Sequence, residues 1–182
     1  TVVIDKTNPI APSLTGISAG NYNSNQTFTL TGESGSTLEY SVDNASTWLT
    51  YSGAVSLSIE GTYTVIGRQT DQASNLSVNT SSVVLTIDKT TDSAPTITGI
   101  SSGYYNTNQT FTVSGTGNII QYTINGGSTW LTYSGAVSLS TEATYSVSAR
   151  QFDLAGNLSS NASTITVVID KTNPIAPSLT GI

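Results

Sequence analysis

The chain has 182 residues, of which 9% are charged, and its 11 acids outnumber its 5 cations to give a net charge of −6. Because it contains neither histidine nor cysteine, it lacks the commonest general base and zinc ligand, and no disulfide stabilises it. The few scattered cations form no basic patch, so nucleic acid is not an expected partner, and no apolar run is long enough to span a membrane.

A tandem repeat organises the chain. The segment from Ser46 to Ser58 returns unchanged as Ser128 to Ser140, and the segment from Thr1 to Ile17 returns as Thr166 to Ile182. Self-similarity of this kind is the signature of an array of structural units. The junction from Leu85 to Ile100 is related to the two outer junctions but not identical to them. This favours a longer array in which two kinds of unit alternate, with artificially duplicated ends as the alternative.

In chain order, the repeat divides the sequence into four parts. We expect residues 1–10 to be the last strand of a preceding unit plus a junction, residues 11–89 the first complete unit, residues 90–172 the second, and residues 173–182 the first strand of a following unit. Each junction contains proline or lies next to one, and proline stiffens the chain and cannot donate a ladder hydrogen bond. The junctions are therefore expected to be short and semi-rigid rather than flexible tethers.

Within each unit the apolar residues recur with a period of two, which is typical of strands with one buried and one solvated face. The expected strands of the first unit carry these apolar residues: Phe28 and Leu30; Leu38, Tyr40 and Val42; Val55 and Leu57; Tyr63 and Val65; Val83, Leu85 and Ile87. Matching residues follow in the second unit from Phe111 to Ile169. The sequence predicts an all-β chain of two tandem antiparallel β-sandwiches with about seven strands each, joined end to end.

Two stretches carry a resemblance to a known family. Gly61-Thr-Tyr-Thr-Val65 resembles the tyrosine corner of immunoglobulin-like sandwiches, and Asp153-Leu-Ala-Gly-Asn157 resembles a loop motif of bacterial surface repeats. Over nearly all of both units the chain is similar to the bacterial Ig-like repeats of large adhesins, and also to chitobiase C-terminal-like modules. The resemblance implies an Ig-like fold and a place on the bacterial cell surface. The first unit has Ala73-Ser74 where the motif has Ala-Gly, which weakens the prediction of a left-handed turn there.

Four acids are candidate ligands for a metal ion. The resemblance implies calcium, because related adhesin arrays stiffen their junctions with it, and the ligands would be Asp71, Asp88, Asp153 and Asp170. Calcium binds several oxygen ligands, including carboxylates and backbone carbonyls. The alternative is that Asp71 and Asp153 close their own loops by Asx-type hydrogen bonds. These acids have no neighbouring nucleophile and base, so the chain is not predicted to be an enzyme and needs no cofactor.

Aromatic residues mark a turn between strands in each unit: Trp48 with Tyr51, and Trp130 with Tyr133. Exposed aromatic side chains stack on sugar rings and mark binding surfaces. These four residues are therefore candidate carbohydrate ligands. The alternative is that each tryptophan packs over the end of its sandwich as part of the core.

Two arginines, Arg68 and Arg150, fall on the outward phase of their strand. Each would lie across a tryptophan ring or pair with a nearby acid. Glu39 is a cross-strand candidate for Arg68, whereas the second unit has Gln121 at the matching position. The ion pair is therefore not expected to repeat.

The sequence predicts a structural stalk or spacer segment of a long, repetitive bacterial extracellular adhesin or fibre, which projects a distal tip or scaffolds a biofilm. Its partners would be the neighbouring repeats of the same chain. Two alternatives stay open. One is a carbohydrate-binding module that uses the four aromatic residues on a surface polysaccharide. The other is a fibre subunit that self-associates when Thr1–Lys6 inserts into a neighbour.

Overall fold

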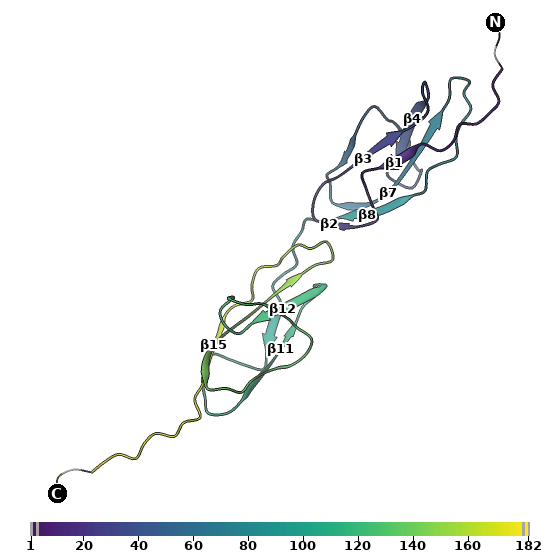
Figure 1. Cartoon of the computed structure of the whole chain (residues 1–182). Helices are drawn as coiled ribbons and strands as arrows, with labels where there is room; N and C mark the ends of the chain where they lie inside the picture. The colour runs from purple at the N-terminus through teal and green to yellow at the C-terminus, as the bar shows by residue number, and fades with distance from the viewer. Residues whose placement is uncertain (1, 3, 180, 182) are drawn as a thin grey trace. The chain divides into compact units, whose positions relative to one another are not determined.

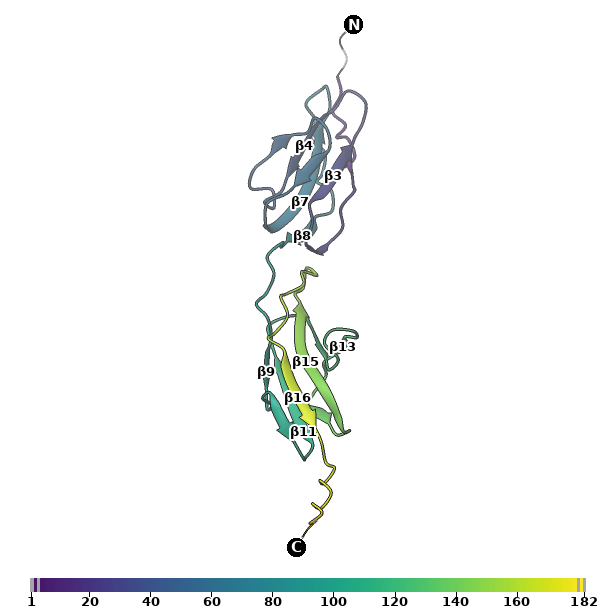
Figure 2. The same cartoon turned by 90° about the vertical axis from the view of Figure 1, so that its left-hand side faces the viewer.

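The computed structural model describes residue 2, residues 4–179 and residue 181, and it divides into two compact units, Thr1–Thr90 and Thr91–Ile182. The division lies one residue beyond the boundary expected from the sequence. Every regular element in the described part of the chain is a β-strand, as Figures 1 and 2 show for each unit. No helix among these residues is long and apolar enough to cross a membrane.

The strands repeat in order and length from one unit to the next. Unit 1 contains β1 (Ser13–Thr15), β2 (Gly20–Tyr22), β3 (Gln26–Thr31), β4 (Thr37–Ser41), β5 (Leu49–Thr50), β6 (Val55–Leu57), β7 (Gly61–Thr70) and β8 (Val83–Ile87). Unit 2 contains β9 (Thr96–Thr98), β10 (Gly103–Tyr105), β11 (Gln109–Ser114), β12 (Ile119–Thr123), β13 (Leu131–Thr132), β14 (Val137–Leu139), β15 (Ala143–Phe152) and β16 (Ile165–Ile169).

Each unit is a two-layer sandwich. In unit 1 a 3-stranded sheet in the order β1-β3-β6 faces a 5-stranded sheet in the order β2-β8-β7-β4-β5. Unit 2 has the matching sheets β14-β11-β9 and β10-β16-β15-β12-β13. The expected fold class is therefore confirmed, with one addition: β2 pairs with β8 in parallel, and β10 pairs with β16 in parallel.

The parallel pairing arises because the first strand of each unit changes sheets. In unit 1, β1 pairs with β3 in one layer and β2 pairs with β8 in the other. Gly16, between them, has φ +91°, and a Cβ at this position would lie 2.8 Å from the Thr27 carbonyl oxygen. Only glycine fits such a close approach in a left-handed conformation. Gly99 has the same role in unit 2, with φ +93°.

The core of each sandwich consists of the apolar residues that the period-two pattern singled out. Phe28 and Val65 are completely buried in unit 1, and so are Phe111 and Val147 in unit 2. The Phe28 ring meets the Tyr40 ring edge to face, with centroids 5.5 Å apart. Full burial of such a side chain contributes about 1.5–3 kcal/mol each. The repeat in sequence thus becomes a repeat of two equivalent cores.

Tyrosine hydroxyls tie the strand ends to the turns before them. Tyr63 Oη donates to the Ile59 carbonyl at 2.8 Å, and Tyr145 Oη donates to the Thr141 carbonyl at 2.9 Å. These bonds confirm the tyrosine corner expected from Gly61-Thr-Tyr-Thr-Val65. A half-buried ring with a satisfied hydroxyl fixes the turn that leads into the longest strand of each unit.

The outer segments do not form the strands expected for neighbouring units. Residues 4–10 and residues 173–179 have no regular structure, and Thr1, Val3, Thr180 and Ile182 lie outside the described residues. A strand needs a partner ladder for its backbone groups. The sequence assigns both segments to units other than the two described, so a ladder within this chain is not available to them.

Candidate functional site

An arginine lies across a tryptophan on the outer face of the 5-stranded sheet of unit 1. The Arg68 Cζ atom is 3.9 Å from the Trp48 ring centroid. Arg68 Nε also donates to Glu39 Oε2 at 2.8 Å, and the two residues are cross-strand partners on β7 and β4. Both contacts suggested by the sequence therefore form together. Cation–π contact and ion pair hold the guanidinium in one plane.

The same stack recurs in unit 2 with different chemistry around it. The Arg150 Cζ atom is 4.1 Å from the Trp130 ring centroid and 5.8 Å from that of Phe152. Arg150 Nε donates to Gln121 Oε1 at 2.8 Å. The geometry of the ion pair is thus retained, but the acceptor is neutral.

The structure corrects the interpretation of the tryptophans as core residues. Trp48 and Trp130 are half-buried beneath the arginines, and neither belongs to a core cluster. The reason is register: each tryptophan precedes a short edge strand on its outward phase, whereas a core residue must point inward.

The four candidate aromatic residues do not form one surface. Tyr133 packs against the core of unit 2, and its ring centroid is 6.4 Å from that of Tyr122. Trp130, three residues earlier, lies on the outer face with Arg150. Successive side chains of an extended segment point to opposite faces, so residues an odd number apart are separated by the sheet. Tyr51, the counterpart of Tyr133, is half-buried.

The two loop acids, Asp71 and Asp153, each close their own turn. Asp71 accepts hydrogen bonds from Asn75 Nδ2 and from the backbone N–H of Asn75, both at 2.8 Å. The amide of Asn75 is the main reason that the pKa of Asp71 lies below its ordinary value. Partial burial of Asp153 opposes ionisation, but hydrogen bonds from Asn157 and neighbouring backbone groups keep its pKa below the ordinary value too.

The turn after β7 is left-handed even without the expected glycine. Ser74 has φ 68°, and its counterpart Gly156 has φ 89°. The Asp71 carboxylate accepts hydrogen bonds from the turn that contains Ser74, which holds the strained conformation in place. The left-handed turn therefore forms in both units, although Ala73-Ser74 replaces Ala-Gly in unit 1.

Asp71 and Asp88 lie at opposite ends of unit 1. Asp71 follows the last residue of β7, whereas Asp88 follows Ile87, which pairs with Gly61 at the first residue of β7. Asp153 and Asp170 are separated in the same way along β15. The described residues contain no group of three or more acids, histidines or cysteines that could hold a metal ion. The structure therefore does not bring the predicted calcium ligands together within a unit.

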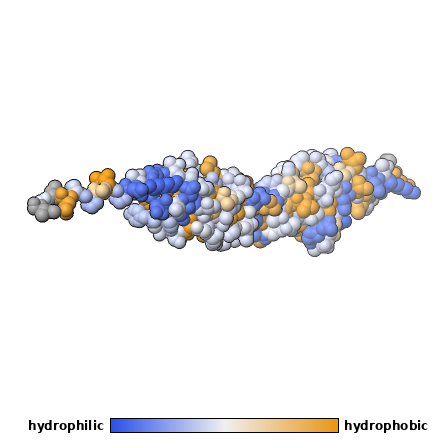
Figure 3. Space-filling model, turned by 90° about the horizontal axis from the view of Figure 1, so that it is seen from below, coloured by the Kyte–Doolittle hydropathy of each residue, from blue (hydrophilic) through white to orange (hydrophobic). Residues whose placement is uncertain are grey.

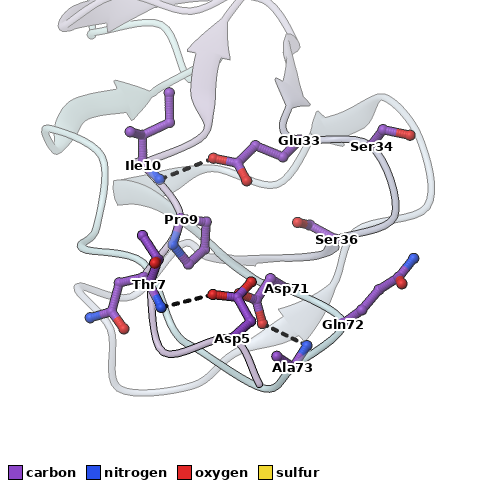
Figure 4. Close-up of a pocket in the computed structure, with 11 residues that line it drawn as sticks. Asp5, Thr7, Pro9, Ile10, Glu33, Ser34, Ser36, Asp71, Gln72 and Ala73 are labelled. Atoms are coloured by element: carbon purple, nitrogen blue, oxygen red, sulfur yellow. Dashed lines mark hydrogen bonds between the residues drawn. The ribbon is translucent and has the colours of Figure 1, made fainter. Parts of the chain in front are cut away.

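A different junction acid, Asp5, lies near Asp71. The two carboxylates and Glu33 line a pocket of about 720 Å³ at one end of unit 1, shown in Figure 4. Asn75 Nδ2 donates to the Asp5 carbonyl at 3.2 Å. Asp5 occupies the same place in Ile-Asp-Lys-Thr as Asp88, so the repeat contained the signal for this residue. Asp5 and Asp71 are the residues that could share a cation here.

A lysine and a glutamate fix the end of each unit. Lys89 Nζ donates to the Ser58 carbonyl at 2.6 Å and to Asn25 Oδ1 at 2.7 Å. Glu60 accepts from the backbone N–H of Lys89 at 2.6 Å and from Thr90 Oγ1 at 3.0 Å. The same contacts recur in unit 2 between Lys171, Thr172, Ser140, Asn108 and Glu142. This cluster was not predicted from the sequence, although Glu60 and Lys89 both repeat, as Glu142 and Lys171.

A buried glutamine fixes the start of each unit. Gln69 is completely buried at the inward phase of β7, where its Nε2 donates to the Ile10 carbonyl at 2.7 Å and its Oε1 accepts from Glu33 N–H at 2.9 Å. Gln151 makes the matching contacts with Ser93 and Gly117. A buried amide needs its partners, because an unpaired polar group in the core is costly. The incoming segment therefore forms part of the core's hydrogen bonding.

Comparison with known proteins gives no family. No protein-family model matches the sequence, and no curated protein matches it. Among solved structures, the chain is similar to the fibronectin(III)-like modules of Clostridium thermocellum CbhA, with TM-score 0.46 and 12% identity over 87% of this chain and 93% of that chain. It is also similar to the FN1–FN3 domains of chicken CNTN1, with TM-score 0.44 and 13% identity over 89% of this chain and 68% of that chain.

Proposed function

We propose that the two units are spacers in a longer, repetitive extracellular chain, such as the stalk of a bacterial adhesin or fibre. In this function each sandwich adds length, and the junctions limit how far one unit bends against the next. The units carry out no chemistry themselves. Their partners are neighbouring repeats of the same kind.

One observation carries this proposal: hydrogen bonds reach the junction from both directions. Lys89 and Thr90 are bound by unit 1, whereas Asp92 and Ser93 are bound by unit 2. Thr91 lies between these two sets of contacts. A linker this short has few rotatable bonds left to reorient its two ends. The repeat of the same contacts in both units supports a role that depends on joining units.

The test is the rotational diffusion of each unit, measured by NMR relaxation of backbone amides. A restricted junction predicts equal tumbling times for the two units, at the value for the whole chain. A control variant with Gly-Ser-Gly-Ser inserted after Thr91 should tumble as two faster, separate bodies, because flexible linkers uncouple domains. Fast independent tumbling in the unmodified protein would reject the spacer proposal.

The extracellular location has a separate test. Antibodies raised against the folded two-unit protein should label intact cells that produce the natural protein. The label should disappear after mild protease treatment of those cells. Labelling that requires permeabilised cells would place the chain inside the cell and remove this part of the proposal.

Self-association by strand exchange is a second candidate, and one observation favours it. Thr1–Ile4 has the same sequence as Thr166–Ile169, which includes Val167 and Ile169 of β16, and those two are 0% and 2% exposed. In the first copy Val2 is 89% exposed and Ile4 is 78% exposed. A segment that fits a strand position in one molecule fits the same position in another. Light scattering over a range of concentrations would show the assembly, and a constant monomer mass would exclude it.

A further inference from the structure

The outer faces of the two 5-stranded sheets differ in the residues around the same Arg–Trp stack. Cross-strand partners in unit 1 are Thr37 with Thr70 and Glu39 with Arg68. The matching pairs in unit 2 are Ile119 with Phe152 and Gln121 with Arg150. In unit 2, Gln121 removes the anion, and Ile119 and Phe152 add apolar surface. The next pair on this face differs the other way, since Ser41 with Ile66 in unit 1 corresponds to Thr123 with Ser148 in unit 2. The stack itself is the same in both units, so its different surroundings in unit 2 need an explanation of their own.

The charge of Arg150 is not balanced by an acid. Within the described residues, the ion pair of Arg68 with Glu39 is the one salt bridge, whereas Arg150 bonds the neutral amide of Gln121. The chain as a whole has a net charge of −6. An unpaired guanidinium on such a protein attracts an external anion locally, even though the rest of the surface repels it.

The Arg150 guanidinium is also held in a fixed plane. It lies 4.1 Å from the Trp130 ring centroid and 5.8 Å from that of Phe152. A guanidinium binds a carboxylate through two parallel hydrogen bonds, and little entropy is lost when its orientation is already fixed. Its planar fork therefore matches a carboxylate better than it matches a spherical anion.

Apolar side chains lie directly beside this charge. Ile119 is 43% exposed and is the cross-strand partner of Phe152. Aromatic and aliphatic side chains pack against the flat C–H face of a sugar ring. A sugar acid presents such a face and a carboxylate on one rigid ring, whereas an acidic peptide carries its carboxylates on flexible chains. The combination favours the sugar acid.

We propose that Arg150, Trp130, Phe152, Ile119 and Gln121 form a binding face on unit 2 for carboxylate-bearing polysaccharides, with uronic acid residues as the ligand. Arg150 binds the carboxylate, and the apolar residues contact the ring. Unit 1 lacks this activity because Glu39 neutralises Arg68 and because Thr70 replaces Phe152. This inference goes beyond the spacer role and does not depend on it.

The test is an NMR titration of the whole protein with oligogalacturonate, and with neutral galactan oligomers of the same length as control ligand. The chain has 2 tryptophans, so each unit reports through one indole N–H signal. We expect oligogalacturonate to shift the Trp130 signal and to leave the Trp48 signal in place. The shift should decrease at high salt because the contact is ionic.

Two variants in unit 2 and one control variant in unit 1 separate recognition from structural support. Gln121→Glu gives unit 2 the ion pair of unit 1 without removing the stack, and it should weaken binding about tenfold, as expected for the loss of a charge-assisted hydrogen bond. Arg150→Gln should abolish binding. Glu39→Gln is the control in unit 1: it changes one charge at the matching position, and the protein should stay folded. A dispersed amide spectrum verifies folding in each case.

Several outcomes would overturn the proposal. Equal shifts with neutral galactan would mean that the charge has no part, and equal shifts of Trp48 and Trp130 would mean that the difference between units has no part. Unchanged binding by Gln121→Glu would also mean that the difference between the units has no part in binding. An aspartate-rich peptide that binds as tightly as oligogalacturonate would assign the face to a protein partner instead. No shift with any ligand would leave Arg150 as a structural clamp on the sheet.

Discussion

Gln69 donates a hydrogen bond of 2.7 Å to the carbonyl of Ile10, which lies far away in sequence but beside it in the fold. This contact joins a completely buried side chain of the longest strand to the segment that enters unit 1. The entering segment is thereby part of the folded unit rather than an appendage to it. The first prediction depends on this bond.

Gln69→Leu should destabilise unit 1 by about 1–3 kcal/mol, because the Ile10 carbonyl and the Glu33 N–H would lose their partner in the core. The measurement is hydrogen exchange of amides in β1 and β3, which should become faster in unit 1 and stay unchanged in unit 2. Gln151→Leu is the matched variant and should give the reverse pattern. Exchange that rises equally in both units, or in neither, would contradict this role of the glutamines.

Left-handed residues provide a second prediction. Ala45 has φ 64°, and its counterpart Gly127 has φ 92°. A non-glycine residue in this conformation costs about 1 kcal/mol, so Ala45→Gly should stabilise unit 1 by roughly that amount. Gly127→Ala should destabilise unit 2 by a similar amount, because alanine would have to adopt the left-handed conformation. No steric cost is added, since the new Cβ would lie 3.7 Å from the Trp130 ring, an ordinary contact distance. Denaturant unfolding of each variant measures both values, and equal signs for the two changes would refute the argument.

A third prediction concerns the pH dependence of unit 1. Hydrogen bonds from Thr47, first through its side chain and then through its backbone, and from Ser41 lower the pKa of Asp43 from 3.8 to about 2. Since the folded pKa is the lower one, the stabilisation is complete above the unfolded pKa near 3.8 and is lost as the pH falls towards 2. NMR titration of the Asp43 carboxyl carbon should give a midpoint near 2.

Unit 2 supplies the control for Asp43. Asn125 stands at the matching position and makes equivalent contacts with Thr123 and Thr129. Asp43→Asn should therefore keep this turn and remove its acid sensitivity between about pH 4 and pH 2, whereas the turn that Asp71 closes should stay acid-sensitive. If the variant loses amide protection in this range as the unmodified protein does, another group causes the dependence.

The lysine contacts at the end of each unit give a fourth prediction. Lys89→Met removes the hydrogen bonds to the Ser58 carbonyl and Asn25 Oδ1, and it should destabilise the end of unit 1 by about 1 kcal/mol. The amide of Asp88, which donates to the Tyr22 carbonyl at 2.9 Å, should exchange faster. Lys6→Met is the matched control, since Lys6 has the same sequence neighbours, Asp and Thr, but does not follow a strand as Lys89 follows β8. Similar effects of both variants would argue against the contact.

Calcium at the junction gives the fifth prediction. We propose Asp5 and Asp71, rather than Asp71 and Asp88, as the acids that would share an ion, because they line one pocket. A bound ion stabilises the folded state by an amount that grows with the logarithm of its concentration over its dissociation constant. EDTA should then lower the melting temperature, and Asp5→Asn should remove this effect. An unchanged melting temperature on chelation would exclude calcium from the junction.

Local patterns in the sequence determined much of the fold. The period-two apolar residues place Phe28 and Val65 in one core and Phe111 and Val147 in the other, because alternation along a strand decides which side chains point inward. The tyrosine corner is equally local, since the hydroxyl of Tyr63 reaches a carbonyl only four residues earlier. Such features depend on neighbours in the chain, so the sequence alone was sufficient to predict them.

Only the tertiary structure decided which residues meet across the sandwich. In an antiparallel pair the end of one strand lies beside the start of the other, so Asp88 lies beside the start of β7 and Asp71 lies beyond its end. Asp5, and not Asp88, lines the pocket with Asp71. The sheet likewise separates Trp130 from Tyr133, and the fold buries Gln69 against Ile10. These contacts depend on strand pairing and on which face each chain segment presents, and residue spacing in the sequence does not specify either of them.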